Sequence, residues 1–300
     1  MPMRAAYLKD SFGSRLFDWI NAILMFIMAF VMLYPFWNQL IVSLNEGMDT
    51  ARGGLYFWPR AFTLDNYRYM FENGNLTRGA VISVLRVTVG TATTLFCSGL
   101  LAYVTTVKWF SGRRFTRVMF LITLYFSGGL VPTYLLYNKL NLMDTFTVYW
   151  LPGLFSAYYM LLISSYMYNL PDALAESARI DGCGELKIYM KIIAPLCVPV
   201  FAAVAVFSAV GHWNSWFDVI LYNSSGKWDT LQVYLRKILL DVEQVGKLTN
   251  EQKQMEEMRK LTPLSIRAAT TMIVTLPIII SYPFFQKYFI SGITIGAVKE

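Results

Sequence analysis

The sequence is short of charged residues, histidine and cysteine, and each shortage excludes a class of protein. Charged residues make up 15% and hydrophobic residues 56% of the 300 positions, against about 25% and roughly 45–50% in ordinary globular chains. The single histidine, His212, excludes a metal site of several histidines and disfavours a His-based catalytic triad. The three cysteines, Cys97, Cys183 and Cys197, have neither a metal-ligand spacing nor that of a disulfide framework, and we expect free thiols. The composition is that of a membrane protein.

The sequence also lacks a phosphate-binding loop. The pairs Gly226–Lys227 and Gly246–Lys247 have no upstream glycine at the required spacing and no hydroxyl residue after the lysine. We therefore expect the chain not to hydrolyse ATP and to hold no cofactor of its own. The formal net charge of +7 is typical of membrane proteins with basic cytoplasmic loops, and it does not indicate a nucleic-acid partner.

Six apolar runs are long enough to cross a bilayer, which takes about 20 residues. They are Ile20–Ile41, Ala80–Val107, Val118–Leu136, Val148–Met167, Ile192–Trp213 and Ala268–Phe289. The first is too long for the roughly 7–15-residue core of a signal peptide, so we expect it to be retained. Several prolines interrupt the runs and permit bends: Pro132, Pro152, Pro199, Pro277 and Pro283. The predicted fold class is an all-α membrane protein with six transmembrane helices in one domain, residues 1–300.

The basic residues predict the orientation of these spans. Four cations lie between the second and third runs, whereas only Lys139 lies in the next loop. The four are Lys108, Arg113, Arg114 and Arg117. Short loops rich in Lys and Arg stay in the cytoplasm, so both termini are expected inside, and the loops Asn45–Gly79 and Phe217–Arg267 outside.

Within the second of these outer loops, "LQVYLRKILLDVEQV" and "EQKQMEEMRKL" predict short amphipathic helices. They would form a small extramembrane lobe. The alternative is a solvated connector.

A charged stretch, "LPDALAESARIDGCGELKIYMKIIAP" (Leu170–Pro195), lies between two apolar runs on the predicted cytoplasmic side. We expect a helix over residues 171–182, stopped by Gly182 and Gly184, and a second helix from Glu185 that runs unbroken into the fifth span. One interpretation is a solvated interfacial helix in which Glu176 pairs with Arg179. The other is a docking helix whose small residues let a second protein approach closely.

The segment "ESARIDG", nine residues, and "IIAP" resemble the cytoplasmic signature of ABC-importer permeases, which reads E-A-A, three residues, G, nine residues, I-x-L-P. Ser177 and Ala194 depart from the usual alanine and leucine, and both are small. Four further segments are similar to carbohydrate-importer permeases: "FTLDNYRYMF", "FSGGLVPTYLL", "AVGHWNSWFDVILY" and "QKYFISGITIGAVK". The resemblance is to the smaller subunit of the maltose permease, in the branch associated with complex or acidic oligosaccharides.

This resemblance implies the fold of a type I importer permease in a prokaryotic cytoplasmic membrane. The chain would form half of a pathway for an oligosaccharide, with acidic ones among the candidates, next to a second homologous permease. An extracellular binding protein would deliver the sugar, with the loop at residues 217–267 as its contact. A dimeric cytoplasmic ATPase would carry ATP and Mg. Its contacts would be the coupling helix, with Glu176, Ser177, Ala178, Arg179, Asp181 and Gly182, and the C-terminal Gly296 and Lys299.

Candidate pathway residues are polar or aromatic groups at the spans, because sugars stack their C–H faces on aromatic rings and bond their hydroxyls to short polar groups. They are Tyr134, Tyr158, Tyr159, Ser164, His212, Trp213, Asn214 and Trp216. Interfacial aromatic belts and helix packing would explain the same residues. Arg86 is a cation within a span, which indicates a cavity or a partner, unless it reaches the outer surface.

Two other classes of protein were weighed against the importer. A secondary, ion-coupled transporter should show carboxylates deep in its spans, and only Asp18, at a boundary, comes near. A membrane enzyme would need a cluster of acid, base or nucleophile, but His212 has no carboxylate in its span, and Asp218 is expected outside or at the surface. The cytoplasmic signature separates the importer from both.

Overall fold

The computed structural model describes residues 12–73, 76–245 and 261–297, and its regular elements are helices apart from one isolated bridge between Asn45 and Phe62. Two whole helices, α1 (Phe12–Ser43) and α4 (Leu76–Thr106), and the Pro263–Ser281 part of α15 (Pro263–Ala297) are long and apolar enough to cross a membrane. Three bent helix pairs raise the number to six if each pair counts as one span. The predicted all-α membrane class is confirmed.

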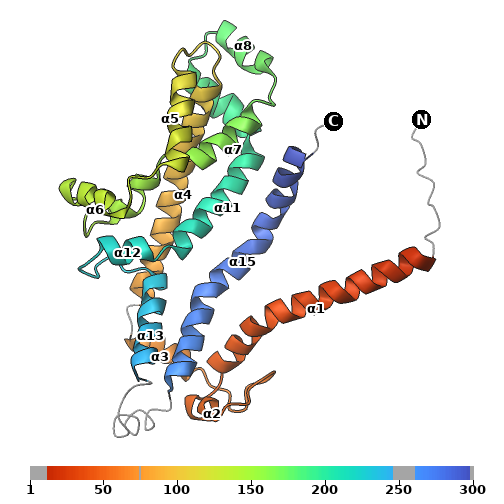
Figure 1. The fold of residues 1–300 in the computed structure, drawn as a ribbon, viewed down its shortest axis with the longest axis vertical. Helices are drawn as coiled ribbons and strands as arrows, with labels where there is room; N and C mark the ends of the chain where they lie inside the picture. The colour runs from red at the N-terminus through yellow and green to blue at the C-terminus, as the bar shows by residue number, and fades with distance from the viewer. Residues whose placement is uncertain (1–11, 74–75, 246–260, 298–300) are drawn as a thin grey trace. The chain divides into compact units, whose positions relative to one another are not determined.

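The contacts within the chain divide it into two compact units. Unit 1 comprises residues 1–70 and 242–272, and unit 2 comprises residues 71–241 and 273–300. Each is described by itself (Figure 1).

The core of unit 2 forms where α4 packs against α7 (Ala157–Met167) and α11 (Val198–Asn214). The buried face of α4 repeats every three to four residues and is built mostly from small side chains: Gly79, Ser83, Gly90, Thr94, Ser98, Gly99 and Ala102. At Gly99, an added Cβ would lie 2.5 Å from the Tyr189 hydroxyl and 2.6 Å from the Phe201 ring. Small residues of this kind are what allow membrane helices to approach closely.

The predicted span Val118–Leu136 is not one helix. The chain forms α5 (Arg113–Tyr125) and α6 (Leu130–Lys139), which meet at an angle of 118°. The break falls at Phe126–Gly129, where Gly129 has a φ of +84°, a conformation that glycine adopts without steric cost. Pro132 lies in the first turn of α6, where its missing N–H costs nothing, so proline is not the cause of this break.

The fourth predicted span, Val148–Met167, is also broken. Two short 3₁₀ turns, η1 (Phe146–Tyr149) and η2 (Leu151–Gly153), precede α7 with a bend of 44°. Hydroxyls of α4 bond the backbone that the break leaves free: Thr94 donates to the Gly153 carbonyl at 2.9 Å, and Ser98 accepts from the Ser156 N–H at 3.1 Å. Irregular backbone is tolerated at membrane depth when neighbouring helices pair its polar groups in this way.

The predicted helix from Glu185 runs into the fifth span without a break as far as Leu196, but the span itself, Ile192–Trp213, is not one helix. The chain forms α9 (Glu185–Ile188), the π-helical η3 (Tyr189–Ile193) and α10 (Ala194–Leu196), then bends by 84° into α11. Cys197 leaves helical geometry at the bend (φ −93°, ψ 8°), and Pro199 follows in the first turn of α11. A proline fits the first turn of a helix, whereas in a helix interior it removes a hydrogen bond and favours a kink or a break. Pro277 and Pro283, in contrast, lie inside α15 without ending it.

A second, smaller core of unit 2 forms where the segment after α11 packs against η1. The predicted helix "LQVYLRKILLDVEQV" is confirmed as α13 (Leu231–Val245), and the short α12 (Phe217–Tyr222) precedes it. "EQKQMEEMRKL" lies outside the described residues except for its last residue, Leu261. Five buried residues form the core: Val148, Tyr149, Val219, Tyr222 and Val233. Beside it, hydrogen bonds from the backbone N–H and hydroxyl of Ser225 lower the pKa of Asp144.

A network of hydrogen-bonded polar side chains holds unit 1 together at the end of α1. Asn66 donates to the carbonyls of Ser43 and Asn45, each at 2.9 Å. Asn45 in turn donates to Asp49 and Thr50, each at 3.0 Å, at α2 (Gly47–Ala51). Asn66 itself belongs to α3 (Asp65–Asn73). These bonds satisfy the backbone groups that the helix end exposes.

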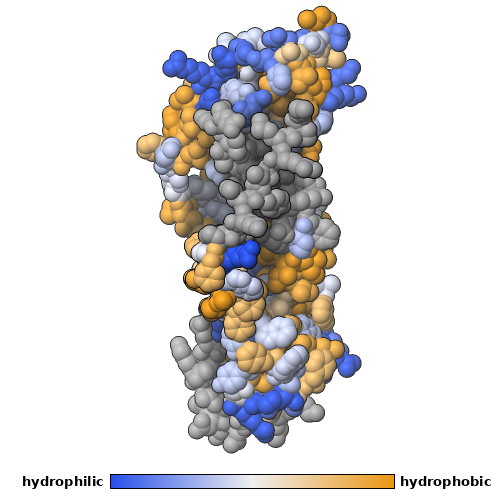
Figure 2. Space-filling model, turned by 90° about the vertical axis from the view of Figure 1, so that its right-hand side faces the viewer, coloured by the Kyte–Doolittle hydropathy of each residue, from blue (hydrophilic) through white to orange (hydrophobic). Residues whose placement is uncertain are grey.

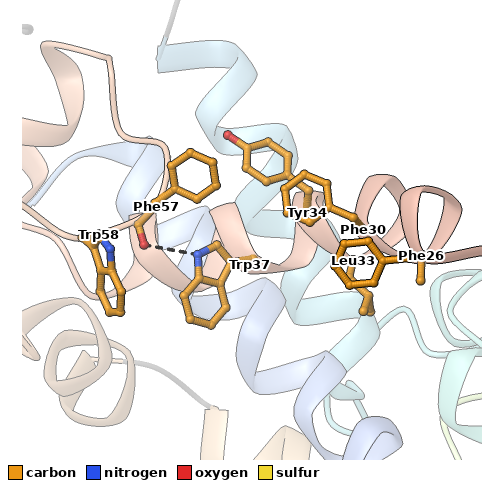
Figure 3. Close-up of a pocket in the computed structure, with 8 residues that line it drawn as sticks. Phe26, Phe30, Leu33, Tyr34, Trp37, Phe57 and Trp58 are labelled. Atoms are coloured by element: carbon orange, nitrogen blue, oxygen red, sulfur yellow. Dashed lines mark hydrogen bonds between the residues drawn. The ribbon is translucent and has the colours of Figure 1, made fainter. Parts of the chain in front are cut away.

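An aromatic groove of about 450 Å³ lies on α1 in the same unit (Figure 3). Trp37 donates its indole N–H to the Phe57 carbonyl at 3.2 Å, and its ring meets Trp58 edge to face at 6.2 Å between centroids. The most apolar stretch of α1 is otherwise without any residue buried inside the structure. That surface suits lipid or another subunit.

We predict that the close approach of α4 and its neighbours is sensitive to a single methyl group. Gly99→Ala should destabilise the protein by on the order of 1–3 kcal/mol, because its Cβ meets two aromatic side chains. The melting temperature in detergent should fall by several degrees. Gly211→Ala is the matched control, since a Cβ there meets nothing within 4 Å. Equal melting temperatures for the two variants would show that the packing around Gly99 is loose.

Candidate functional site

The charged stretch folds as a short helix, α8 (Asp172–Ile180), at one end of unit 2, while α12 and α13 lie toward the other end (Figure 1). Asp172 lies in the first turn, where a negative charge is favourable. Gly182, with a φ of +76°, ends the helix: its N–H bonds the Arg179 carbonyl at 3.0 Å, and the Cys183 N–H bonds the Ala178 carbonyl at 2.9 Å. This Schellman pattern turns the chain sharply toward α9.

One face of α8 is open and the other is held against the unit. Glu176, Ser177 and Asp181 are exposed, whereas Ala178 is buried. Ile180 is 86% exposed, an unusual position for an isoleucine at a charged surface. Hydrophilic side chains gather at this end of the unit, with apolar ones among them (Figure 2). The open face therefore offers both charge and apolar surface to a partner.

The inner side of α8 is tied to α4 through Glu185. Arg179 Nε donates to Glu185 Oε1 at 2.6 Å, and the Tyr103 hydroxyl of α4 donates to Glu185 Oε2. The predicted pairing of Arg179 with Glu176 is wrong, because the glycine turn brings Glu185 within reach instead. The hydrogen bond to Glu185 raises the pKa of Arg179. We call these two contacts of Glu185, with Arg179 and with Tyr103, the brace; it joins α8, α9 and α4.

The basic loop between the second and third predicted spans lies at the same end as α8. Lys108 forms an ion pair with Asp172, and the Arg117 guanidinium lies 5.1 Å from the centre of the Tyr168 ring. The two segments that the sequence places on one side of the membrane are therefore in contact.

An ion pair with a buried cation lies in the other half of unit 2. Arg86 on α4 is 3% exposed and pairs through both terminal nitrogens with the Asp218 carboxylate of α12, one of these contacts being 3.4 Å long. Its guanidinium also lies 4.7 Å from the centre of the Tyr149 ring. His212 lies within electrostatic reach of both charges and packs against Gly90. Asp218 was expected outside or at the surface; its side chain is 27% exposed, and the short α12 turns its carboxylate toward α4.

The other predicted pathway residues do not form one cluster. Tyr134 stacks with Tyr222 at 6.2 Å, and Tyr158 meets Tyr159 at 5.7 Å between ring centroids. Ser164 is buried and bonds the Leu161 carbonyl of its own helix.

Three others lie around the end of α11. Trp213 donates to the Val274 carbonyl at 3.1 Å, Asn214 accepts from Gln232 at 3.2 Å, and the Arg236 guanidinium lies 3.9 Å from the Trp216 ring centre. A sugar contact stays a prediction for each of these residues. Of the two predicted C-terminal contacts, Gly296 belongs to α15 and Lys299 lies outside the described residues.

Sequence alone does not point to Asp218, Tyr149, Glu185 or Tyr103. For Asp218 a signal existed: a cation inside a span requires an anionic partner. For Glu185 the sequence signal was weaker, because its pairing with Arg179 depends on the direction that the chain takes after the glycine turn.

The described part of the chain is thus helical, with a charged and partly open helix at one end of unit 2 and the Arg86–Asp218 ion pair in its other half. Comparison with known proteins identifies its family. The chain is 33% identical to the polygalacturonan/rhamnogalacturonan transport system permease protein YtcP of Bacillus subtilis, over 95% of this chain and 99% of that protein. It is 30% identical to the arabinooligosaccharides transport system permease protein AraQ of Halalkalibacterium halodurans, over 95% and 98%.

Among solved structures, a bacterial ABC transporter involved in the import of the acidic polysaccharide alginate has a chain that matches with a TM-score of 0.85 and 25% identity, over 93% of this chain and 99% of that one. No family model matches.

The chain belongs to the permease subunits of binding-protein-dependent ABC sugar transporters, in the branch for complex oligosaccharides. Such subunits have no catalytic activity, and ATP hydrolysis lies in a separate subunit. The family works in the inner membrane with a partner permease, an ATPase and a binding protein. Nothing supports the secondary-transporter alternative.

We predict that Arg86 and Asp218 stabilise the protein as a pair. Asp218→Leu leaves the buried Arg86 without its carboxylate partner and should cost up to about 3–5 kcal/mol. The double variant Arg86→Met, Asp218→Leu should cost much less, because apolar residues of similar volume replace both charges. Thermal unfolding of Arg86→Met, of Asp218→Leu and of the double variant measures the coupling energy. Simply additive losses would mean that the two side chains do not stabilise each other.

Proposed function

We propose that this chain forms half of the translocation pathway of an oligosaccharide importer and couples to its ATPase through α8. The observation that carries the proposal is that α8 has two different sides. Glu176 and Ile180 are exposed on one side, and Arg179 bonds Glu185 on the other. A helix held this way can receive a push from a partner and pass it to α4. The open face would enter a cleft of the ATPase, with Glu176, Ser177, Asp181 and Gly182 among the contact residues.

In this arrangement the chain has six spans, each bent helix pair counting as one, and both termini are cytoplasmic. The support is the distribution of charge. The cations Lys108, Arg113, Arg114 and Arg117 belong to the loop and helix that contact the α8 region, as expected for the cytoplasmic side. The α12–α13 end would then face outward, where the loop at residues 217–267 would meet the binding protein.

The assembly would pair this chain with a second, homologous permease, above two ATPase subunits that bind ATP and Mg. The chain itself would hold no cofactor. The C-terminal residues Gly296 and Lys299 would add a second contact with the ATPase.

The substrate would be a complex oligosaccharide, and an acidic one is favoured. One relative is named for polygalacturonan and rhamnogalacturonan, and the structural neighbour imports the acidic polysaccharide alginate. Another relative is named for arabinooligosaccharides, so a neutral substrate is the second candidate. Arg86, His212 and the aromatic candidates would contribute contacts at separate places along the pathway.

The proposal is tested by isolating the complex and measuring uptake. A detergent pull-down from the native membrane should bring down a second permease and an ATPase, and the reconstituted complex with its binding protein should import trigalacturonate only with ATP. Glu176→Lys should abolish uptake while the chain still inserts in the membrane, because the reversed charge lies on the exposed docking face. Normal uptake by this variant would exclude α8 as the coupling element.

We predict that Glu185 transmits movement from α8 to α4. Glu185→Gln weakens two charge-assisted hydrogen bonds, each worth roughly 1.5–3 kcal/mol. Sugar uptake per ATP hydrolysed should fall about tenfold, while ATP hydrolysis and assembly persist. Lys187→Gln, on the exposed side of the same helix, is the control.

A charge swap separates transmission from simple folding. Arg179→Glu combined with Glu185→Arg restores the ion pair and should recover part of the coupling that either single change loses. Equal uptake per ATP in all variants would remove Glu185 from the coupling path.

A further inference from the structure

A small polar pocket of about 140 Å³ lies where the first turns of α4 meet the start of α13. Its walls come from α4, from the turn before α13 and from α13 itself: Arg78, Gly79, Gly226, Asp229, Tyr234 and Lys237. All belong to unit 2. Drug-sized ligands fill pockets of roughly 300–1,000 Å³, so this one has room for a single small unit.

Positive charge exceeds negative charge in this pocket. Both oxygens of the Asp229 carboxylate already have partners: Lys237 forms an ion pair with one, and Asn223 donates to the other at 2.9 Å. Arg78 bonds only a backbone carbonyl, that of Lys227 at 2.9 Å, and no carboxylate pairs with it among the described residues. One guanidinium is therefore left to bind an anion.

A hydroxyl in the pocket wall is without a partner. Thr230 also lines the pocket, is 1% exposed, and its Oγ1 makes no hydrogen bond within the described structure. A buried polar group left unpaired costs roughly 1–3 kcal/mol. Thr230 directly precedes α13, whose first N–H groups add partial positive charge at the same place.

The space exists because two wall residues have no side chain. A Cβ at Gly79 would lie 3.4 Å from the Leu231 nitrogen, and one at Gly226 would lie 3.7 Å from the Asp229 carboxylate. Gly226 also has a φ of +69°, which favours glycine. Larger residues at either position would fill the pocket.

We propose that this pocket is a subsite for one uronate unit of an acidic oligosaccharide. Arg78 binds the carboxylate, Thr230 pairs with a ring hydroxyl, and Tyr234 adds an aromatic ring to the wall. Cation, hydroxyl and aromatic ring together match a sugar that carries a carboxylate. The inference rests on the proposed function for the outward orientation of α13 and for the class of substrate.

The test is direct binding of trigalacturonate, and of galactotriose as its neutral counterpart, to the full importer complex without its binding protein. Trigalacturonate should bind the wild-type complex more tightly, and Arg78→Gln should weaken its binding about tenfold or more, as expected for loss of a charge-assisted hydrogen bond. Galactotriose binding should not change. Lys227→Gln removes an equal charge from the same region but not from the pocket wall, and should bind as wild type. Equal loss in both variants, or none in Arg78→Gln, overturns the subsite.

A second measurement needs no variant. Carbodiimide coupling of trigalacturonate to the wild-type complex should modify Lys237 in the pocket in preference to Lys227, as read by peptide mass spectrometry. Equal labelling of the two lysines counts against the subsite. Import is scored separately: a wild-type complex that imports only neutral sugars contradicts the proposed substrate class, whereas import of trigalacturonate without an Arg78 effect contradicts the subsite alone.

Discussion

The rest of unit 2 depends on the close packing that the small residues of α4 allow. Gly90, Gly99 and Ala102 bring α4 near its neighbours, and the hydroxyls of Thr94 and Ser98 then reach the broken backbone before α7. In a membrane, no water is present to satisfy those groups. The same helix face therefore supplies close contact and hydrogen bonds together, and the breaks in the neighbouring spans are stable only because α4 is near.

The two ends of this helix carry different polar chemistry. Near the end of α4, Tyr103 bonds Glu185, which in turn bonds Arg179 of α8. Toward the start of α4, Arg86 pairs with Asp218, and Arg78 lines the polar pocket. A buried ion pair contributes little net stability, because desolvation offsets most of the attraction, but it is costly to break on one side only. Such a pair specifies which surfaces meet. Here it fixes α12 against α4 across 132 positions of sequence.

Much of this architecture could be predicted from the sequence, and the failures have common physical causes. The long apolar runs and the helix at residues 171–182 depend on local composition and turn residues, and α13 formed with the predicted bounds. The bends could not be placed, because a long apolar run looks the same whether straight or broken. In α15 two prolines leave the helix continuous, while the largest bend, 118°, lies at a Ser-Gly-Gly turn. Tertiary partners decide whether the freed backbone groups are satisfied, and these partners are distant in sequence.

The candidate site divides in the same way. Candidate contact residues such as Glu176 were predicted from a local motif, whereas Glu185 and Tyr103, which link α8 to α4, needed the fold. An α-helix rises about 1.5 Å per residue, so the 17 positions from Tyr103 to Arg86 correspond to about 26 Å. No proline interrupts α4 over this length. In the proposed function, a push on α8 would reach α4 through the Glu185–Tyr103 hydrogen bond, and the same helix carries Arg86 toward its start. The hydrogen bonds of Glu185 and the Arg86–Asp218 ion pair lie at the two ends of this stretch, so the proposed coupling has one continuous helix to act through.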